Sequence, residues 1–337
     1  MKTVSSITLY STCPQSKDAQ QGEYAALVRE IARWSEAAGC HGMLVYTDNG
    51  IADPWLVAQH AIEGTTSLRP LVAVQPAYMH PYTAAKMIAT LAYLHGRTVD
   101  LNLLAGGFSN DLAALGEQAE HDDRYARTVE YGTIVRRLVE GTEPVTFEGR
   151  FYQVESLRLT PPVEPSLHPQ LLVSGSSPAG VDAARALGAV AVKYPLPPGE
   201  EYPTADVDVL RGIRVGIIAR EEASEAWAVA RERFPEDRRG QLAHSLAMKV
   251  SDSHWHRSLS QKDEPEDEES QVYWLRPFKN YSTFCPYFVG SYDDVAAEIA
   301  QYINLGFRTF ITDIPREPDD LDHACIVLGR AAAASRA

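Results

Sequence analysis

Short runs of apolar residues alternate along the chain with longer stretches in which apolar residues recur every three or four positions. The short runs are rich in Val, Ile and Leu without polar alternation, which is typical of strands buried on both faces. Eight strands are predicted, at residues 5–11, 42–47, 69–76, 99–106, 169–175, 189–196, 212–220 and 308–314. The longer stretches predict eight helices, at residues 23–39, 53–65, 80–96, 123–141, 177–188, 221–234, 291–306 and 319–335.

This alternation predicts the α/β class, with residues 1–337 forming a (β/α)8 TIM barrel as a single domain. Parallel strands need crossover connections, and the predicted helices supply them. A doubly wound sheet is the alternative, and it would place a glycine-rich turn after the first strand. The sequence there is STCPQSKDAQQG (11–22), which contains no such turn. A chain of 337 residues exceeds the roughly 250 of a plain barrel, so insertions are expected.

Two segments interrupt the alternation. Residues 143–168 are predicted to form a β-hairpin, because two strand-like runs flank a Glu-Gly turn. Residues 235–290 are long and irregular, and we expect them to form a mobile lid over the barrel mouth. Within them, the acidic run at 263–269 would stay solvated. The aromatic stretch at 273–288 would either cover the site or pack in the core.

The charge of the chain restricts its partners. Its 31 Lys and Arg against 45 Asp and Glu give a net charge of −14, which argues against nucleic acid and anionic membrane surfaces. No run approaches the ~18 apolar residues of a membrane span and no signal peptide is visible, so a cytoplasmic protein is expected. The four cysteines lack CxxC spacing and are expected to be free thiols. No metal site is expected, because His254 and His256 have no third ligand nearby.

Candidate functional residues follow the predicted strands, because barrel enzymes carry their chemistry at the carboxyl ends of the strands. Ser176 and Ser177 lie between the strand at 169–175 and a helix opened by Pro178. Backbone N–H groups, the helix dipole and two hydroxyls meet there, which favours a phosphate site. The alternative is a plain N-cap, since Ser before Pro caps helices routinely.

His121 and Tyr125 follow the fourth predicted strand, at the start of a helix. Because they are four residues apart, they share one helix face, where they would suit a phosphate or a ribityl chain. A charged, capped helix start is the alternative. No GxSxG sequence indicates a serine hydrolase, and Lys193 is the one barrel-strand lysine near the mouth.

Four segments, in this order, resemble the luciferase-like family of flavin-dependent monooxygenases. They are HPYTAAKMIATLAYLHGRTVDLNLLAGG (80–107), EHDDRYARTVEYGTIVRRLVEG (120–141), FEGRFYQVESLRLTPP (147–162) and VSGSSPAGVDAARALG (173–188). The resemblance covers about residues 20–330 and is strongest to the branch with alkanesulfonate and long-chain alkane monooxygenases. It implies a (β/α)8 barrel, a homodimer or homotetramer, and reduced FMN (FMNH2) as cofactor. It also implies an NAD(P)H-dependent flavin reductase as the source of FMNH2. Oxygen would reach a small organic substrate from O2 through a C4a-peroxyflavin.

The resemblance also implies that eight residues bind the cofactor. Those at the phosphate end would be His121, Tyr125, Ser176 and Ser177. Those beside or below the isoalloxazine ring would be Asp48, Gln75, Ala77 and Asn102.

Three positions depart from the alkanesulfonate oxygenases. Ile51 replaces a cysteine, Gly216 replaces the histidine of an Arg-x-His pair, and Ile314 replaces a tyrosine. The arginine of the pair remains as Arg214, our candidate catalytic residue. An inward arginine needs an anion, which would be a peroxyflavin oxygen, the FMN phosphate, a substrate anion or a barrel carboxylate such as Asp48. The absence of the cysteine, the histidine and the tyrosine argues against a sulfonate substrate and favours a bulkier or less charged one.

Two other functions are compatible with these residues. A deazaflavin-dependent hydride-transfer oxidoreductase would share the barrel of the family. A flavin-binding homologue without catalysis would bind flavin and give no product. Oxygen consumption with added reduced FMN separates the monooxygenase from the hydride-transfer enzyme.

Overall fold

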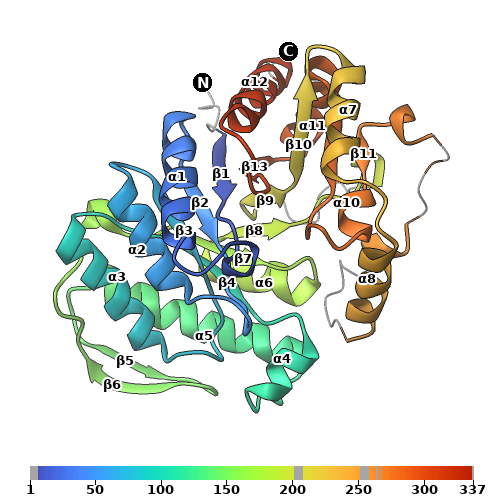
Figure 1. Ribbon diagram of the computed structural model, residues 1–337. Coiled ribbons are helices and arrows are strands. Elements are labelled where there is room, and N and C mark those ends of the chain that lie inside the picture. The colour runs from blue at the N-terminus through green and yellow to red at the C-terminus, as the bar shows by residue number, and fades with distance from the viewer. Residues whose placement is uncertain (1–6, 201–207, 251–257, 263–264, 266, 336–337) are drawn as a thin grey trace.

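Eight parallel strands close into a barrel in the computed structural model, which describes residues 7–200, 208–250, 258–262, 265 and 267–335 (Figure 1). The strands are β1 (Thr8–Thr12), β2 (Gly42–Val45), β3 (Arg69–Val74), β4 (Asp100–Leu104), β7 (Leu171–Ser174), β8 (Val190–Lys193), β9 (Arg211–Arg214) and β13 (Phe307–Ile311). They follow one another around the barrel in this order, and β13 pairs with β1 to close it. The predicted (β/α)8 barrel is therefore confirmed.

Helices lie around the barrel, and three of them begin with a side-chain cap followed by a proline. The side chains of Asp53, His80 and Ser177 each accept a backbone N–H of the first turn, and each precedes a proline. Gly96 and Gly188 end two of these helices in the left-handed conformation, at φ 59° and 57°. The helices of the barrel layer are α1 (Tyr24–Ala37), α2 (Pro54–Gly64), α3 (Pro81–His95), α5 (His121–Glu140), α6 (Pro178–Leu187), α11 (Tyr292–Asn304) and α12 (Asp319–Ala334).

A buried carboxylate and its hydrogen-bond partners lie at the amino ends of the strands. Asp100 is fully buried and accepts hydrogen bonds from the Tyr10 hydroxyl at 2.9 Å and from the Gln170 N–H at 2.8 Å. The Arg69 guanidinium lies 3.4 Å from the same carboxylate. Burial, together with Asp100, raises the pKa of Tyr10 above its ordinary value, so that its hydroxyl keeps its proton. This end of the barrel is a packed, stabilising end.

Five further strands form two small sheets outside the barrel. β5 (Val145–Glu148) and β6 (Gln153–Leu157) pair antiparallel within the segment where we predicted a hairpin. A three-stranded sheet contains β10 (Gly216–Arg220), β12 (Tyr287–Ser291) and β11 (Tyr273–Trp274) in this order. Further helices are α4 (Ser109–Ala114), α7 (Ala223–Arg233), α8 (Arg238–Val250) and α10 (Arg276–Lys279).

The prediction of one strand at 212–220 is wrong, because this run contains two strands in different sheets. β9 stays in the barrel, while β10 pairs with β12. The Val215 N–H still donates to the barrel residue Ile311, whereas the next N–H, of Gly216, donates to Pro286. The helix predicted at 221–234 is α7, and it covers β10 and β12 rather than a barrel strand (Figure 1). Both halves of the run are buried, so their apolar pattern is continuous.

The segment 235–290 is more regular than expected where the structure describes it. It contains α8, β11 and α10, and it leads into β12. Trp274 and Tyr287 pack against Trp227 and Phe234 in a buried cluster, so much of the aromatic stretch is core. Residues 263–264 and 266 of the acidic run lie outside the described residues, as do His254 and His256. The lid therefore stays a prediction.

Two kinds of feature are absent from the described part of the chain. None of its helices combines the length and the apolar character needed to cross a bilayer. Nor do three or more His, Cys, Asp or Glu side chains gather there in the way that metal ligands do.

Candidate functional site

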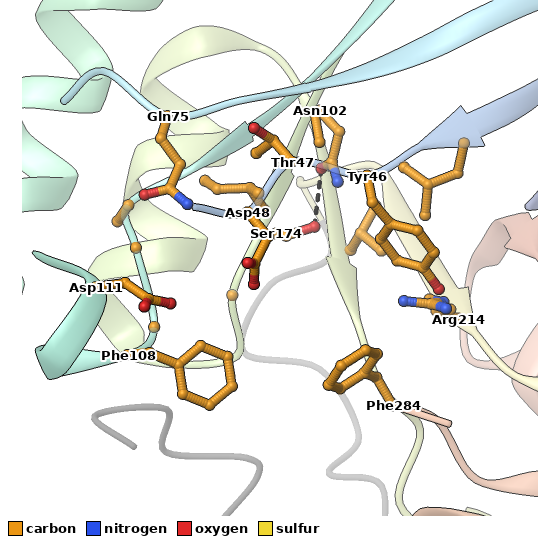
Figure 2. A pocket seen from close by; sticks show the side chains of 18 of the residues that line it. Tyr46, Thr47, Asp48, Gln75, Asn102, Phe108, Asp111, Ser174, Arg214 and Phe284 are labelled. Carbon is orange, nitrogen blue, oxygen red and sulfur yellow. Dashed lines mark hydrogen bonds between the residues drawn. The ribbon is translucent and has the colours of Figure 1, made fainter. Parts of the chain in front are cut away.

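A cavity opens at the carboxyl ends of the barrel strands and takes side chains from loops after most of them (Figure 2). It brings together eight of the nine residues predicted for the site, namely Asp48, Gln75, Asn102, His121, Tyr125, Ser176, Ser177 and Arg214. Ala77 is half-buried and does not line it. Residues that are far apart in sequence thus meet at one end of the barrel, as the strand-end rule predicts.

The loop between β7 and α6 forms one end of the cavity, and its two serines differ. Ser177 caps α6, since its Oγ accepts the Gly180 N–H at 3.2 Å. The Ser176 Oγ is buried and has no hydrogen-bond partner among the residues that the structure describes. A Cβ added at Gly175, whose φ is +157°, would overlap the Tyr125 hydroxyl, so glycine is required for this close approach. An unpaired hydroxyl at the start of a helix fits an anionic group such as a phosphate.

His121 and Tyr125 lie on the same face of α5, as predicted, and meet this loop. Their rings contact edge to face, with centroids 5.1 Å apart. The Tyr125 hydroxyl donates to the backbone oxygen of Ser174 at 3.2 Å. Burial raises the pKa of Tyr125, so the phenol stays neutral. The His121 Nδ1 lies 2.7 Å from the Asp122 Oδ1, so Asp122 engages this ring nitrogen and not Nε2.

Polar side chains from β3, β4 and their neighbours form the middle of the cavity. The Ser174 hydroxyl donates to the Asn102 Oδ1 at 2.8 Å (Figure 2). Asp48 is exposed and accepts the Gly50 N–H at 2.7 Å. Burial, and secondly the nearby Asp48, raise the pKa of Asp111. Two carboxylates thus approach each other on the side of the cavity opposite Arg214 (Figure 2).

Arg214 at the end of β9 is 5% exposed and lines the other side of the cavity. Its Nη2 donates to the Asp313 Oδ1 at 3.2 Å, and its Nη1 donates to the Tyr194 oxygen at 3.1 Å. The guanidinium carbon lies 4.7 Å from the centre of the Tyr46 ring. The barrel carboxylate that balances this charge is therefore Asp313 and not Asp48. The Nε of Arg214 is buried, and no acceptor for it lies in the described part of the chain.

Asp313 is held by further hydrogen bonds. Its Oδ2 accepts from the Thr283 hydroxyl at 2.5 Å and from the Tyr287 hydroxyl at 2.8 Å. The Tyr287 ring occupies the space that a Cβ at Gly216 would need, which explains why a larger side chain does not fit there. Arg214 and Asp313 form an ion pair without net charge, so this end of the cavity does not attract an anion as an unpaired arginine would.

The sequence interpretation missed four lining or supporting residues. Phe108 and Phe284 line the cavity, and Figure 2 shows them flanking it from different segments. Phe108 precedes a short helix that was not predicted, and Phe284 lies in the irregular part before β12. Asp111 belongs to the same short helix. Asp313 could have been found, because it lies at the end of the strand predicted at 308–314.

The two serines of the loop before α6 give a direct prediction. Ser177→Ala should lower the free energy of unfolding by about 1 kcal/mol, because it removes an N-cap. Ser176→Ala should leave stability unchanged, since its hydroxyl has no partner within the described residues; if this loop holds the phosphate of reduced FMN, as the resemblance implies, the variant should weaken that binding by about 1–3 kcal/mol. Urea unfolding and anaerobic flavin titration measure the two effects. Equal behaviour of the variants in both assays would contradict the assignment.

Comparison with known proteins shows which family the chain belongs to. Residues 6–309 match the profile of the family described as luciferase-like monooxygenase. A relative from Niallia circulans is 32% identical over 302 residues, covering 87% of this chain and 88% of its own. It is the 4-(gamma-L-glutamylamino)butanoyl-[BtrI acyl-carrier protein] monooxygenase BtrO.

Solved structures share the fold at low identity. The long-chain alkane monooxygenase LadA superposes with a TM-score of 0.73 at 15% identity, over 96% of this chain and 91% of that one. An F420-dependent secondary alcohol dehydrogenase, in complex with an F420–acetone adduct, superposes with a TM-score of 0.64, also at 15% identity. It covers 97% of this chain and 99% of its own. On the match over residues 6–309 and the identity with BtrO, this chain belongs to the luciferase-like monooxygenase family.

Proposed function

We propose that this protein is an FMN-dependent monooxygenase that receives reduced FMN from a separate NAD(P)H-dependent flavin reductase. The observation that carries the proposal is the 32% identity with a monooxygenase over 87% of the chain. We further propose that it acts as a homodimer or homotetramer, in keeping with the resemblance. When bound, reduced FMN would supply the two electrons with which one oxygen atom of O2 enters the substrate and the other leaves as water.

The fit of the cofactor rests on the loop before α6. The Ser176 Oγ, His121 and the positive end of the α6 dipole would hold the phosphate, and Tyr125 would fix the loop through its bond to Ser174. Ser177 supports this site as the helix cap rather than as a ligand. The buried, unpartnered hydroxyl of Ser176 is the feature that a phosphate oxygen would satisfy.

The middle of the cavity would hold the isoalloxazine ring. Gln75, Asn102 and Asp48 offer polar atoms to its heteroatoms, and Ser174 fixes the Asn102 amide. Phe108 and Phe284 would exclude water at the opening, which protects a reactive oxygen donor from hydrolysis. Ala77 would act at most by shaping the turn after Gln75, since it does not line the cavity.

Arg214 would act as a hydrogen-bond donor to a neutral oxygen. Asp313 balances its charge, and its Nε is the buried donor without an acceptor. A carbonyl oxygen satisfies that donor without bringing a second charge into the cavity. This arrangement favours an uncharged acyl group at this end over a sulfonate. The substrate named for BtrO is an acyl group on an acyl-carrier protein, and we propose a carrier-bound acyl thioester as the substrate class here.

A deazaflavin-dependent enzyme is the second candidate, because the likeness to the F420-dependent dehydrogenase shows that the barrel is shared. Likeness at 15% identity carries the fold and not the cofactor. The identity with BtrO favours oxygen chemistry.

The proposal is tested with purified protein, a general flavin reductase, NADH, FMN and ¹⁸O2. Thioesters of 4-(γ-L-glutamylamino)butanoate and of shorter and longer acyl groups are offered on a carrier protein. We expect product that contains one ¹⁸O atom and forms only with FMN present. Hydride exchange with reduced F420 together with no ¹⁸O product would establish the alternative. Flavin binding with no product from the whole panel would indicate a homologue without catalysis.

A further inference from the structure

We propose that the exposed face of α8 is the docking surface for the carrier protein that holds the substrate acyl group. The inference rests on the proposed function, because it requires a substrate that remains attached to a protein. Such a partner stays outside the cavity while its acyl arm reaches in. Its docking surface must therefore lie beside the cavity mouth.

The charge of α8 differs from that of the rest of the chain. Within Arg238–Val250 the charged residues are Arg238, Arg239 and Lys249, whereas the whole chain has a net charge of −14. All three are exposed, and none forms an ion pair with another residue that the structure describes. The preceding Asp237 turns to the helix itself, where its carboxylate accepts the Arg239 N–H at 2.9 Å.

Two leucines share this face with the cations. Leu242 is 64% exposed and Leu246 is 55% exposed. Their spacing of four residues places them side by side, and Arg238, Arg239 and Lys249 fall on the same third of the helix circumference. The opposite face packs inward through the buried His244. An apolar centre with charges at its rim is the usual composition of a protein interface.

A chain of aromatic rings connects α8 with the cavity. The His244 ring lies 6.0 Å from the ring of Tyr281, which is 39% exposed. Tyr281 in turn lies 6.0 Å from the ring of Phe284, which lines the cavity. His244 and Tyr281 thus connect the buried side of α8 with the cavity lining at Phe284, which places this helix near the opening with its exposed face turned outward. The exposed Tyr93 and Leu94, by contrast, lie at the end of α3, next to the amino ends of the strands.

The occupant that fits this face has an acidic surface with an apolar patch. A net charge of −14 slows the approach of an acidic partner, except where a local group of cations attracts it. The basic face beside the mouth thus both steers and orients such a partner. We therefore assign the face to an acidic carrier protein whose acyl arm leaves it close to Phe284.

The test uses the full-length protein and the carrier protein BtrI, loaded with a 4-(γ-L-glutamylamino)butanoyl thioester, as probe. The double variant Arg238→Glu/Arg239→Glu is compared with Arg33→Glu/Arg158→Glu. The control makes the same change of net charge at exposed arginines on α1 and beyond β6. We expect the α8 variant to weaken carrier binding about tenfold or more and to flatten its salt dependence, while the control stays near wild type.

Readouts without the carrier separate this inference from the proposed function. Binding of reduced FMN and its oxidation by O2 should be unchanged in the α8 variant. Normal flavin chemistry with no carrier binding by the wild type would overturn the docking surface and leave the monooxygenase intact. Equal weakening in both double variants would also overturn it. So would a change from dimer to monomer in the α8 variant with unchanged carrier binding, because the face would then join two copies of this chain.

Discussion

Asp313→Asn is expected to lower the free energy of unfolding by about 3–5 kcal/mol, because it leaves the buried Arg214 charge without a counter-ion. Arg214 and Asp313 have side chains only 6% and 11% exposed, so water cannot replace the lost partner. The variant should also lose most product formation, since the guanidinium of Arg214 is then held by a weaker, uncharged acceptor in place of a carboxylate. Affinity for reduced FMN should stay close to wild type, because Asp313 does not line the cavity. Chemical unfolding, flavin titration and product assay measure the three effects.

Asp100→Asn is the matched control for this prediction. Asp100 is also buried and also faces an arginine, but it lies at the amino ends of the strands. The Asp100→Asn variant should lower the free energy of unfolding by a similar amount, about 3 kcal/mol, while the folded protein keeps its activity. Adding Arg214→Met to Asp313→Asn should restore part of the stability, since the unpaired charge is then gone. Equal loss of activity in Asp100→Asn and Asp313→Asn would show that destabilisation alone explains the effect.

Gly175→Ala is expected to weaken binding of reduced FMN by about 1–3 kcal/mol, a loss of up to about a hundredfold, because the new methyl group displaces Tyr125. The displaced ring would carry His121 and the loop before α6 with it, which is the end that we assign to the phosphate. Stability should fall as well, since Tyr125 is buried. Fluorescence titration under anaerobic conditions measures the affinity.

Two further variants make this prediction specific. Tyr125→Phe in the Gly175→Ala background removes the atom that overlaps and should recover part of the affinity. Gly329→Ala on α12 places a methyl group in open space and should raise stability by about 0.5–1 kcal/mol without touching flavin binding. Flavin affinity of Gly175→Ala within twofold of wild type would contradict the role of this loop.

Much of the fold follows from the sequence, because buried parallel strands and capped helices leave strong local signals. The apolar runs predict the barrel strands, and Asp-Pro, His-Pro and Ser-Pro pairs mark three helix starts. The change of sheet at Gly216 left no such signal, since the single residue Val215 separates β9 from β10 and no loop marks the change. β12 escaped prediction for a related reason. Its partner β10 is distant in sequence, and only tertiary pairing fixes it as a strand.

The site was predictable to the extent that its residues end barrel strands. Ser176 and Arg214 lie at such ends and line the cavity. Ser177 directly precedes Pro178, so the sequence favours it as the cap, but the sequence does not show that the Ser176 Oγ is buried in the loop beside it. Nor does it show that Asp313 rather than Asp48 faces Arg214, since every strand end of a barrel is a candidate neighbour.

The central claim is that reduced FMN binds with its phosphate against Ser176 at the start of α6. Anaerobic titration of the wild type and of Ser176→Ala with reduced FMN, reduced riboflavin and reduced F420 tests it most directly. The account predicts that FMN binds more tightly than riboflavin by about 1–3 kcal/mol. It also predicts that most of this difference in binding free energy is lost in Ser176→Ala. Equal affinities for FMN and riboflavin in the wild type, or tight binding of F420 with none of FMN, would contradict it.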